Sequence, residues 1–326
     1  MNKPVSSKID SKKAKTEAPG RAPYMVFAHY MPSTRPLAFN PNDTYWYDTP
    51  YHIDRDNLLT RPSLTPRPDA PNVLYQGYVD DIRLAKSYGI DGFFVDYLED
   101  EDAYRTAWTY LLKAAEQEGD FKIGMMPDAA TLGGDYVKDG NQKYGTKREK
   151  VRRWLDIAGD SPALLRYDDK PVVMEYGNGY PDANGTAQQV KSQFLDWMKA
   201  QGKPVSYGAV LGADWPLYEK PFAKDPKTGY PDIAFGMGTF TPGLTETKFF
   251  ERHLKYFGDD TLQMGENRFM YYNSKWFYSG DRLTTTYRKF WQFLIANRNR
   301  IRWTQLLTWN DLGESAMQPT VHHGMA

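Results

Sequence analysis

The stretch Gly77–Leu98, GYVDDIRLAKSYGIDGFFVDYL, contains the structural unit that repeats along the chain. In residues 77–89 the apolar side chains recur at roughly helical spacing, and the segment stops at a glycine, as a helix C-terminus often does. Residues 91–98 follow at once as a short apolar run rich in β-prone residues. The stretch therefore predicts a helix followed directly by a buried strand.

The same alternation extends in both directions from this unit. Strands are predicted at 24–31, 91–98, 121–129, 170–179, 204–215, 232–240, 268–277 and 302–311. Helices are predicted at 77–89, 103–119, 146–159, 186–201, 245–257 and 284–299, with a weak, Pro-broken stretch after the fifth strand. Strands that alternate with helices pair in parallel through crossovers. Eight such units predict an α/β fold, a (β/α)₈ TIM barrel.

A doubly wound open sheet is the alternative to the barrel. It is less favoured because AHYMPS, which ends the first strand, does not match the GxGxxG phosphate loop. Only MQPTVHHGMA follows the eighth strand, so the closing C-terminal helix is missing. We expect either a fragment of a longer protein or another element that covers this face. Residues 1–22 are expected to form a disordered tail or linker, and residues 23–326 one barrel domain.

Composition excludes several classes of function. The 41 basic and 41 acidic side chains cancel, which argues against a nucleic-acid partner. The chain has no cysteine, so disulfides and thiolate metal sites are excluded. No run approaches the ~18 apolar residues of a membrane helix, and we expect no membrane partner. The aromatic share is 15%, and such rings suit an amphipathic ligand, although they can equally fill a core.

Polar and aromatic residues gather where the predicted strands end, which is where barrel enzymes form their active sites. The candidate binding residues are His29, Tyr30, Asp96, Asp128, Glu175, Asp214, Trp215, Asn273, Trp276, Trp309 and Asn310, and two further acids, Asp311 and Glu314, follow the eighth strand. A buried carboxylate is costly unless it is paired or solvated, so these acids indicate a site. Asp128 and Asp214 could equally cap helices, and His29 could be a core histidine.

An acidic, aromatic set of strand ends suits glycosidic cleavage, in which two carboxyl groups flank the scissile bond. No HExxH, HxH or GxSxG pattern occurs, so zinc and serine hydrolases have little support. We expect no metal, no cofactor, and a polysaccharide or oligosaccharide as the partner. At least two of Trp215, Trp276 and Trp309 are expected to stack on sugar rings, the alternative being that they pack as core. The oligomeric state stays open.

The segment Leu306–Ser315, LLTWNDLGES, resembles the TWND-aromatic-GES signature of glycoside hydrolase family 71, the α-1,3-glucanases or mutanases. VFAHYM is similar to that family's opening VxAHFM, GYVDDIRLAKSYGIDGFFVD to its DW-DI-LA-GIDAFALN segment, and NSKWFYS to its SPWFF segment. Family 99, the endo-α-mannosidases and endomannanases, has a comparable NEWHEG turn with two glutamates three residues apart. The similar segments occur in the right order over nearly all of 24–315.

The resemblance implies that Asp311 and Glu314 are the catalytic pair, with Glu314 as general acid and Asp311 as base in an inverting mechanism. It also implies an α-1,3-glucan substrate and an extracellular or periplasmic location, although no signal peptide is visible. The chain departs from the family at Leu312, where an aromatic is usual, at Asp96, where Asn is common, and in its long insert 32–72. A family 99-like α-mannan enzyme and a non-catalytic glycan-binding barrel stay open as alternatives.

Overall fold

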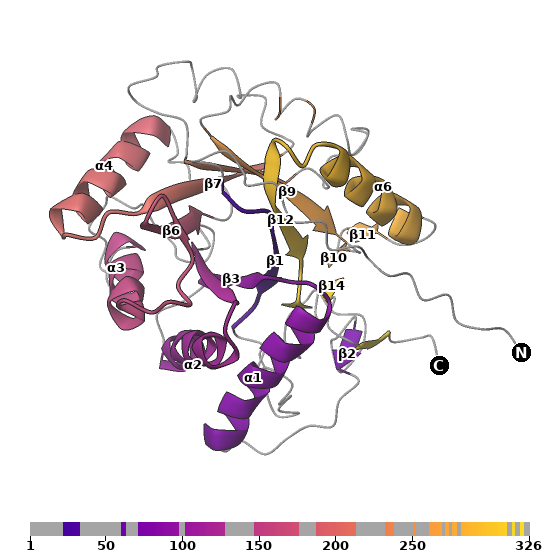
Figure 1. Ribbon diagram of the computed structural model, residues 1–326, viewed down its shortest axis with the longest axis horizontal. Helices are drawn as coiled ribbons and strands as arrows, with labels where there is room; N and C mark the ends of the chain where they lie inside the picture. Colours follow the sequence, from indigo (N-terminus) through magenta and orange to yellow (C-terminus); the bar gives the residue numbers. More distant parts are fainter. Residues whose placement is uncertain are drawn as a thin grey trace, which may run out of the picture.

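The computed structural model describes residues 22–32, 60–62, 71–97, 102–127, 147–175, 187–212, 232–237, 251, 254, 261–268, 271–273, 276–278, 282–311, 315–316 and 320–322. Eight parallel strands form its centre: β1 (Met25–Tyr30), β3 (Gly92–Tyr97), β4 (Lys122–Pro127), β6 (Lys170–Glu175), β7 (Ser206–Gly212), β8 (Ile233–Met237), β9 (Leu262–Arg268) and β12 (Ile301–Leu307). The first strand, β1, pairs with β3 and with the last strand, β12, and β4 pairs with β6, so the eight strands form a closed ring. The predicted TIM barrel is confirmed (Figure 1).

Helices surround the ring of strands in Figure 1. They are α1 (Pro71–Ser87), α2 (Asp102–Glu118), α3 (Lys147–Ala158), α4 (Ala187–Ala200) and α6 (Arg282–Ala296). α1 ends as the sequence predicts: Gly89 has a φ of 77°, and the N–H of Ile90 donates to the carbonyl of Ala85 at 3.1 Å. This backbone conformation suits glycine because a side chain would be strained there. Of the helix predicted at 245–257, only Glu251 and Leu254 are described, and both are helical.

The predicted seventh strand, 268–277, is wrong. β9 takes that place in the barrel, and the aromatic run after it forms the antiparallel hairpin β10 (Tyr271–Asn273) and β11 (Trp276–Tyr278). Aromatic residues favour strands of either kind, so the run could not indicate which sheet it joins. β9 was overlooked because only its alternate residues are apolar. A Cβ on its Gly265 would meet the side chain of Leu294 in α6 at 2.4 Å, so this glycine marks close packing and not a break.

No helix occurs among the described residues after Leu307. Instead β13 (Asn310–Asp311) pairs with β14 (Ser315–Ala316), and β15 (Thr320–His322) pairs antiparallel with β2 (Thr60–Pro62). β2 belongs to the long insert, so segments from both ends of the chain meet here. In the view of Figure 1, β2 and β14 lie between α1 and α6.

Side chains alternate between two packing layers along each barrel strand, as the pleat requires. The interior cluster consists of Phe27, Phe94, Met126, Leu165, Val172, Met174, Ile233, Phe235, Leu262, Met264 and Trp303. The residues between these face the helices, where Ala28, Tyr30, Phe93, Val95, Met125, Val173 and Tyr207 join one large outer cluster. This alternation decides which of the strand-end side chains turn toward the barrel interior.

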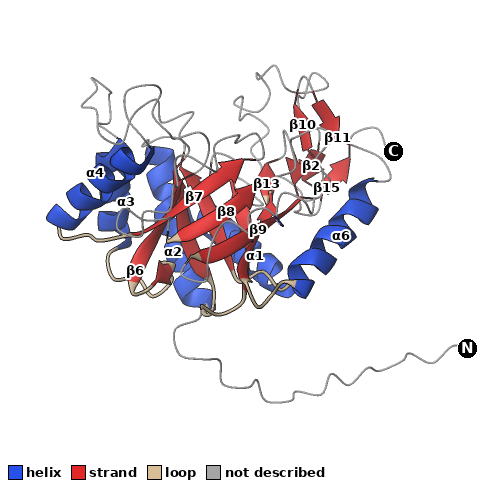
Figure 2. Ribbon diagram, turned by 90° about the horizontal axis from the view of Figure 1, so that it is seen from above, coloured by secondary structure: helices blue, strands red, loops and turns tan. Residues whose placement is uncertain are grey.

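Two aspartates set the strand register at the amino ends of the strands, where the helix-to-strand turns lie (tan in Figure 2). Asp91, just before β3, accepts a hydrogen bond from the N–H of Val26 in β1 at 2.7 Å. Asp232, just before β8, accepts one from the N–H of Tyr207 in β7 at 2.9 Å. Burial raises the pKa of the Asp91 carboxyl, and the bond from Val26 opposes this in part.

We predict that Asp91→Ala and Asp91→Asn have different stabilities. The alanine leaves the Val26 N–H unpaired and should lower the free energy of unfolding by about 0.5–1.5 kcal/mol relative to the asparagine, which can still accept the bond. The raised pKa means that the folded state binds the proton more tightly. The wild type should therefore lose stability relative to Asp91→Asn as pH rises above about 4. Urea unfolding across pH tests both points, and equal stability of the two variants at pH 7 would contradict the first.

Candidate active site

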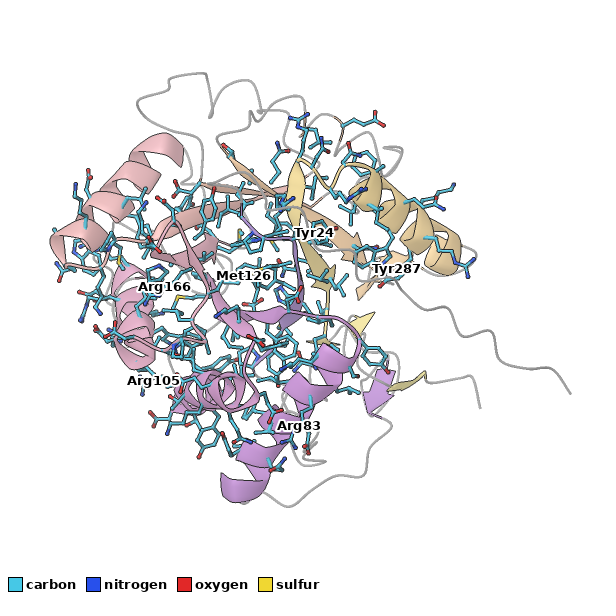
Figure 3. All side chains as sticks on the ribbon, in the orientation of Figure 1. Tyr24, Arg83, Arg105, Met126, Arg166 and Tyr287 are labelled. Carbon is cyan, nitrogen blue, oxygen red and sulfur yellow. The ribbon has the colours of Figure 1, made fainter. Side chains whose placement is uncertain are left out.

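A polar cluster lies inside the barrel near the carboxyl ends of three adjacent strands. Nε2 of His29 in β1 is 2.9 Å from Oδ2 of Asp96 in β3, and both side chains are 3% exposed. Nε2 of Gln305 in β12 is 3.1 Å from Nδ1 of His29 and 3.5 Å from Sδ of Met126 in β4. Met126 is labelled near the middle of the ring in Figure 3. The cluster therefore joins His29 and Asp96, both predicted for the site, to a glutamine that was not.

The contacts determine which way the protons point. The sulfur of Met126 can only accept, so the Gln305 atom beside it is the NH₂ group, and this group also donates to Nδ1 of His29. The proton of the imidazole is then on Nε2 and is donated to Asp96. In this arrangement one ring nitrogen of His29 accepts from Gln305 and the other donates to Asp96.

Tyr30 and Glu175 turn the other way, toward the helices. The hydroxyl of Tyr30 donates to Oδ2 of Asp81 in α1 at 2.9 Å, and burial followed by the charge of Asp81 raises the pKa of Tyr30 well above its ordinary value. Glu175 accepts a hydrogen bond from the hydroxyl of Tyr207, which belongs to the outer cluster. The structure does not bring these two residues to His29 and Asp96, and their contact with a substrate stays a prediction.

Trp309 and Asn310 attach the segment after β12 to the end of β1. The N–H of Trp309 donates to the carbonyl of His29 at 2.7 Å. The Asn310 amide accepts from the N–H of Met31 at 2.7 Å and donates to its carbonyl at 2.9 Å. Trp309 is 1% exposed and packs against Phe93 with ring centroids 5.6 Å apart, so its ring is part of the core.

The predicted catalytic acids belong to the hairpin that begins at Asn310. Asp311 in β13 pairs with Ser315 in β14, and Glu314 immediately precedes Ser315 in the sequence. The backbone of Asp311 is described, but its side chain and Glu314 lie outside the described residues. Their joint action stays a prediction, and what the structure adds is the attachment of their hairpin to β1.

Other predicted site residues also lie partly or wholly outside the described residues. Asp128, Asp214 and Trp215 are wholly outside. Asn273 and Trp276 have described backbones and face each other across the β10–β11 hairpin, so they do not end a barrel strand as predicted. The predicted common cleft of Asp96, Glu175, Asp214, Asp311 and Glu314 is therefore untested as a whole.

Gln305 is the residue that sequence reasoning missed. It is fully buried in β12, whose apolar neighbours Leu306 and Leu307 made the run look like plain core. A polar residue within an apolar strand was the available signal. Within the described part of the chain, no group of three or more potential ligands could hold a metal ion, and no helix is long and apolar enough to cross a membrane.

Comparison with known proteins identifies the fold. No protein-family model matches the chain, and no curated protein matches it significantly. The barrel is similar in fold to two solved structures of one bacterial enzyme. The glycoside hydrolase family 99 endo-α-mannosidase from Bacteroides thetaiotaomicron, in complex with BIS-TRIS-propane, matches with a TM-score of 0.60 and 16% identity, over 91% of this chain and 87% of that one. A second structure of this endo-α-mannosidase matches with a TM-score of 0.59 and 13% identity, over 91% and 88%. At these identities the likeness shows the shared fold.

We call residues 310–316, the β13–β14 hairpin, the acidic hairpin. We predict that Asn310→Ala loosens its attachment to β1. Both backbone groups of Met31 lose their partner, so the free energy of unfolding should fall by about 1–3 kcal/mol. The Met31 amide should also exchange its hydrogen faster. Asn297→Ala is the matched control, because the Asn297 side chain, just after α6, donates a local hydrogen bond to the Phe293 carbonyl of that helix. Chemical denaturation measures the first effect and hydrogen exchange the second. An unchanged exchange rate of the Met31 amide in Asn310→Ala would show that Asn310 does not hold Met31.

Proposed function

We propose that this chain is a glycoside hydrolase of the family 71 type that cleaves an α-linked glucan, with α-1,3 links. The observation that carries the proposal is the acidic hairpin at the carboxyl end of the barrel. Asn310 is bonded to Met31 at the end of β1, and Asp311 follows it directly. Glu314 precedes Ser315, the strand partner of Asp311. Two acids three residues apart in the sequence, directly after the last barrel strand, suit the two-acid chemistry of glycosidases.

The proposed mechanism assigns one role to each acid. Glu314 protonates the oxygen of the leaving sugar, and Asp311 accepts a proton from the water that attacks the opposite face of the ring. Since the water adds from the side opposite the leaving group, the anomeric configuration inverts. Each acid contributes through a proton that moves in the transition state. We also propose an extracellular or periplasmic location for this chain.

A second candidate is an α-mannan-cleaving enzyme. The observation that favours it is the fold match to the Bacteroides thetaiotaomicron endo-α-mannosidase over most of both chains. The two candidates share the hydrolytic chemistry and differ in the sugar. The LLTWNDLGES segment favours the glucan, because it resembles the family 71 signature more fully than the NEWHEG turn of family 99.

Digestion of insoluble α-1,3-glucan, other α-glucans and α-mannans should separate the candidates. We expect glucose oligomers from α-1,3-glucan, with the β-anomer appearing first in proton NMR spectra because inversion of an α-link yields a β-product. Products from mannan alone would establish the second candidate. Binding to glycans with no product from any of them would indicate a glycan-binding barrel without activity.

Substitution of the two acids tests their roles. We expect Glu314→Gln and Asp311→Asn each to lower kcat by at least about 10²-fold, since general acid–base catalysis contributes roughly 10²–10⁴-fold. A substrate with a good leaving group needs less protonation, so it should partly rescue Glu314→Gln only. Added azide should rescue Asp311→Asn only, and the reverse pattern would exchange the two roles.

Two control substitutions make the same chemical changes away from the proposed site. Asp120→Asn lies just before β4, at the amino ends of the strands, and has a φ of 46° that asparagine tolerates. Glu116→Gln lies at an exposed position of α2. Both controls should keep wild-type kcat. Near wild-type activity in both acid variants would refute the catalytic role of the hairpin.

A further inference from the structure

Two buried oxygen atoms inside the barrel receive no hydrogen bond from any described residue. They are Oδ1 of Asp96 and Oε1 of Gln305, and the two residues are 2% and 0% exposed. Other buried atoms of the described residues, such as the hydroxyl of Thr304, also have no partner, but these two acceptors belong to one hydrogen-bonded cluster inside the barrel. Since buried polar atoms in native proteins nearly always have a partner, the pair requires an explanation. Both oxygens can only accept, because Asp96 is already receiving the proton of His29 at its other oxygen.

His29 holds the two acceptors in place. Its Nε2–H bonds Oδ2 of Asp96, and its Nδ1 receives the NH₂ of Gln305. Neither side chain can turn its unpartnered oxygen to the imidazole without losing the bond already made there. The sulfur of Met126 also holds the NH₂ group of Gln305. The donors of the cluster are therefore already used on its other atoms, and a donor for these two oxygens must come from elsewhere.

The location of the cluster indicates the direction from which a donor can come. His29 and Asp96 are each the last inward-facing residue of their strands, one position before the ends at Tyr30 and Tyr97. The interior on the amino side of the cluster is filled by Phe27, Phe94 and Trp303, whose rings pack within 4.8–6.5 Å of one another. A ligand therefore reaches the oxygens from the carboxyl end, the end at which the acidic hairpin begins.

We propose that Asp96 and Gln305 form an acceptor-only subsite that binds the hydroxyl groups of an uncharged sugar residue and rejects uronic acids and phosphorylated sugars. The proposal rests on the proposed function, because it names the substrate class of the same site. A neutral sugar ring offers several hydroxyl donors. A carboxylate or phosphate group offers only acceptors and repels the charge that Asp96 carries. His29 acts here as a positioning residue, which orients both acceptors.

The strength of such a subsite follows from the charge and burial of its acceptors. A hydroxyl that donates to a buried carboxylate forms one of the stronger hydrogen bonds in proteins. A site built to bond a hydroxyl also rejects an analogue that lacks it, because the buried acceptor is then left unpaired. The alternative occupant is a buried water molecule, which can satisfy the same oxygens without any ligand.

Binding of hydrolysis-resistant oligosaccharides tests the subsite. The probes are thio-linked α-1,3-glucotriose, the corresponding α-mannotriose, and versions of each that carry one uronic acid residue. Asp96→Asn can still accept from His29 but presents an NH₂ donor in place of the unpartnered oxygen. For whichever neutral probe the wild type binds more tightly, the affinity of Asp96→Asn should be lower by roughly 10- to 100-fold. Its preference for the neutral over the uronic probe should fall as well, because an NH₂ group can donate to a carboxylate.

Gln305→Met and Thr304→Val form a matched pair of variants on β12. Methionine has a similar shape to glutamine but offers no strong acceptor, so affinity for the neutral probe should fall by roughly 10-fold. Thr304 is adjacent in sequence, equally buried and on the opposite face of the strand, and no described residue bonds its hydroxyl. Thr304→Val should keep wild-type affinity. Thermal unfolding of all the variants checks that each is folded.

The outcomes for the subsite and for the hydrolase are separate. The subsite would be overturned if Asp96→Asn left the affinity unchanged or if the wild type bound no probe. It would also be overturned if versions of the neutral probe that each lack one hydroxyl group all bound as tightly as the complete probe. A crystal structure of the complex with water on both oxygens would do the same. Probe binding that depends on Asp96, with no hydrolysis of any O-linked glycan, would refute the hydrolase and leave the subsite standing.

Discussion

Closure of the barrel between β1 and β12 is the constraint on which the rest of the structure depends. These strands come from opposite ends of the described chain, and they pair in parallel from Met25 opposite Trp303 to Ala28 opposite Leu306. The ring leaves no free sheet edge, so every strand has a neighbour on both sides. Closure also brings His29 within hydrogen-bonding distance of Gln305, which lies 276 residues away in the sequence.

The closed ring gives each strand an inner and an outer face, and this sorting separates residues that look alike in the sequence. His29 and Tyr30 are adjacent, yet one bonds Asp96 inside the barrel and the other bonds Asp81 in a helix outside it. Asp96 and Glu175 both lie near the carboxyl ends of apolar strands, but only Asp96 bonds to His29 inside the barrel. A position at a strand end is therefore insufficient to make a side chain part of a site, because the pleat also has to turn it inward.

The end of β1 connects the interior cluster with the hairpin that carries the proposed catalytic acids. The side chain of His29 orients Asp96 and Gln305, while its carbonyl accepts the N–H of Trp309. Two residues further on, Met31 exchanges two hydrogen bonds with the amide of Asn310. A single strand end thus supports both the floor of the proposed site and the start of the acidic hairpin. The relative positions of a sugar and of the two acids would depend on the same few bonds.

The sequence by itself determined the fold class, because hydrophobic periodicity and the glycine stops are local properties of the chain. It placed seven barrel strands nearly correctly, and it singled out His29 and Asp96 as separate candidate binding residues, but not their pairing. It misplaced the strand now seen at Leu262–Arg268, since alternating apolar residues give a weaker signal than the aromatic run beside them. Only the tertiary structure decided that Gln305 belongs with His29, that Tyr30 and Glu175 face the helices, and that Asn310 binds the backbone of Met31. These contacts join residues far apart in the chain, and they exist only once closure of the barrel has brought the strands together and set which face of each turns inward.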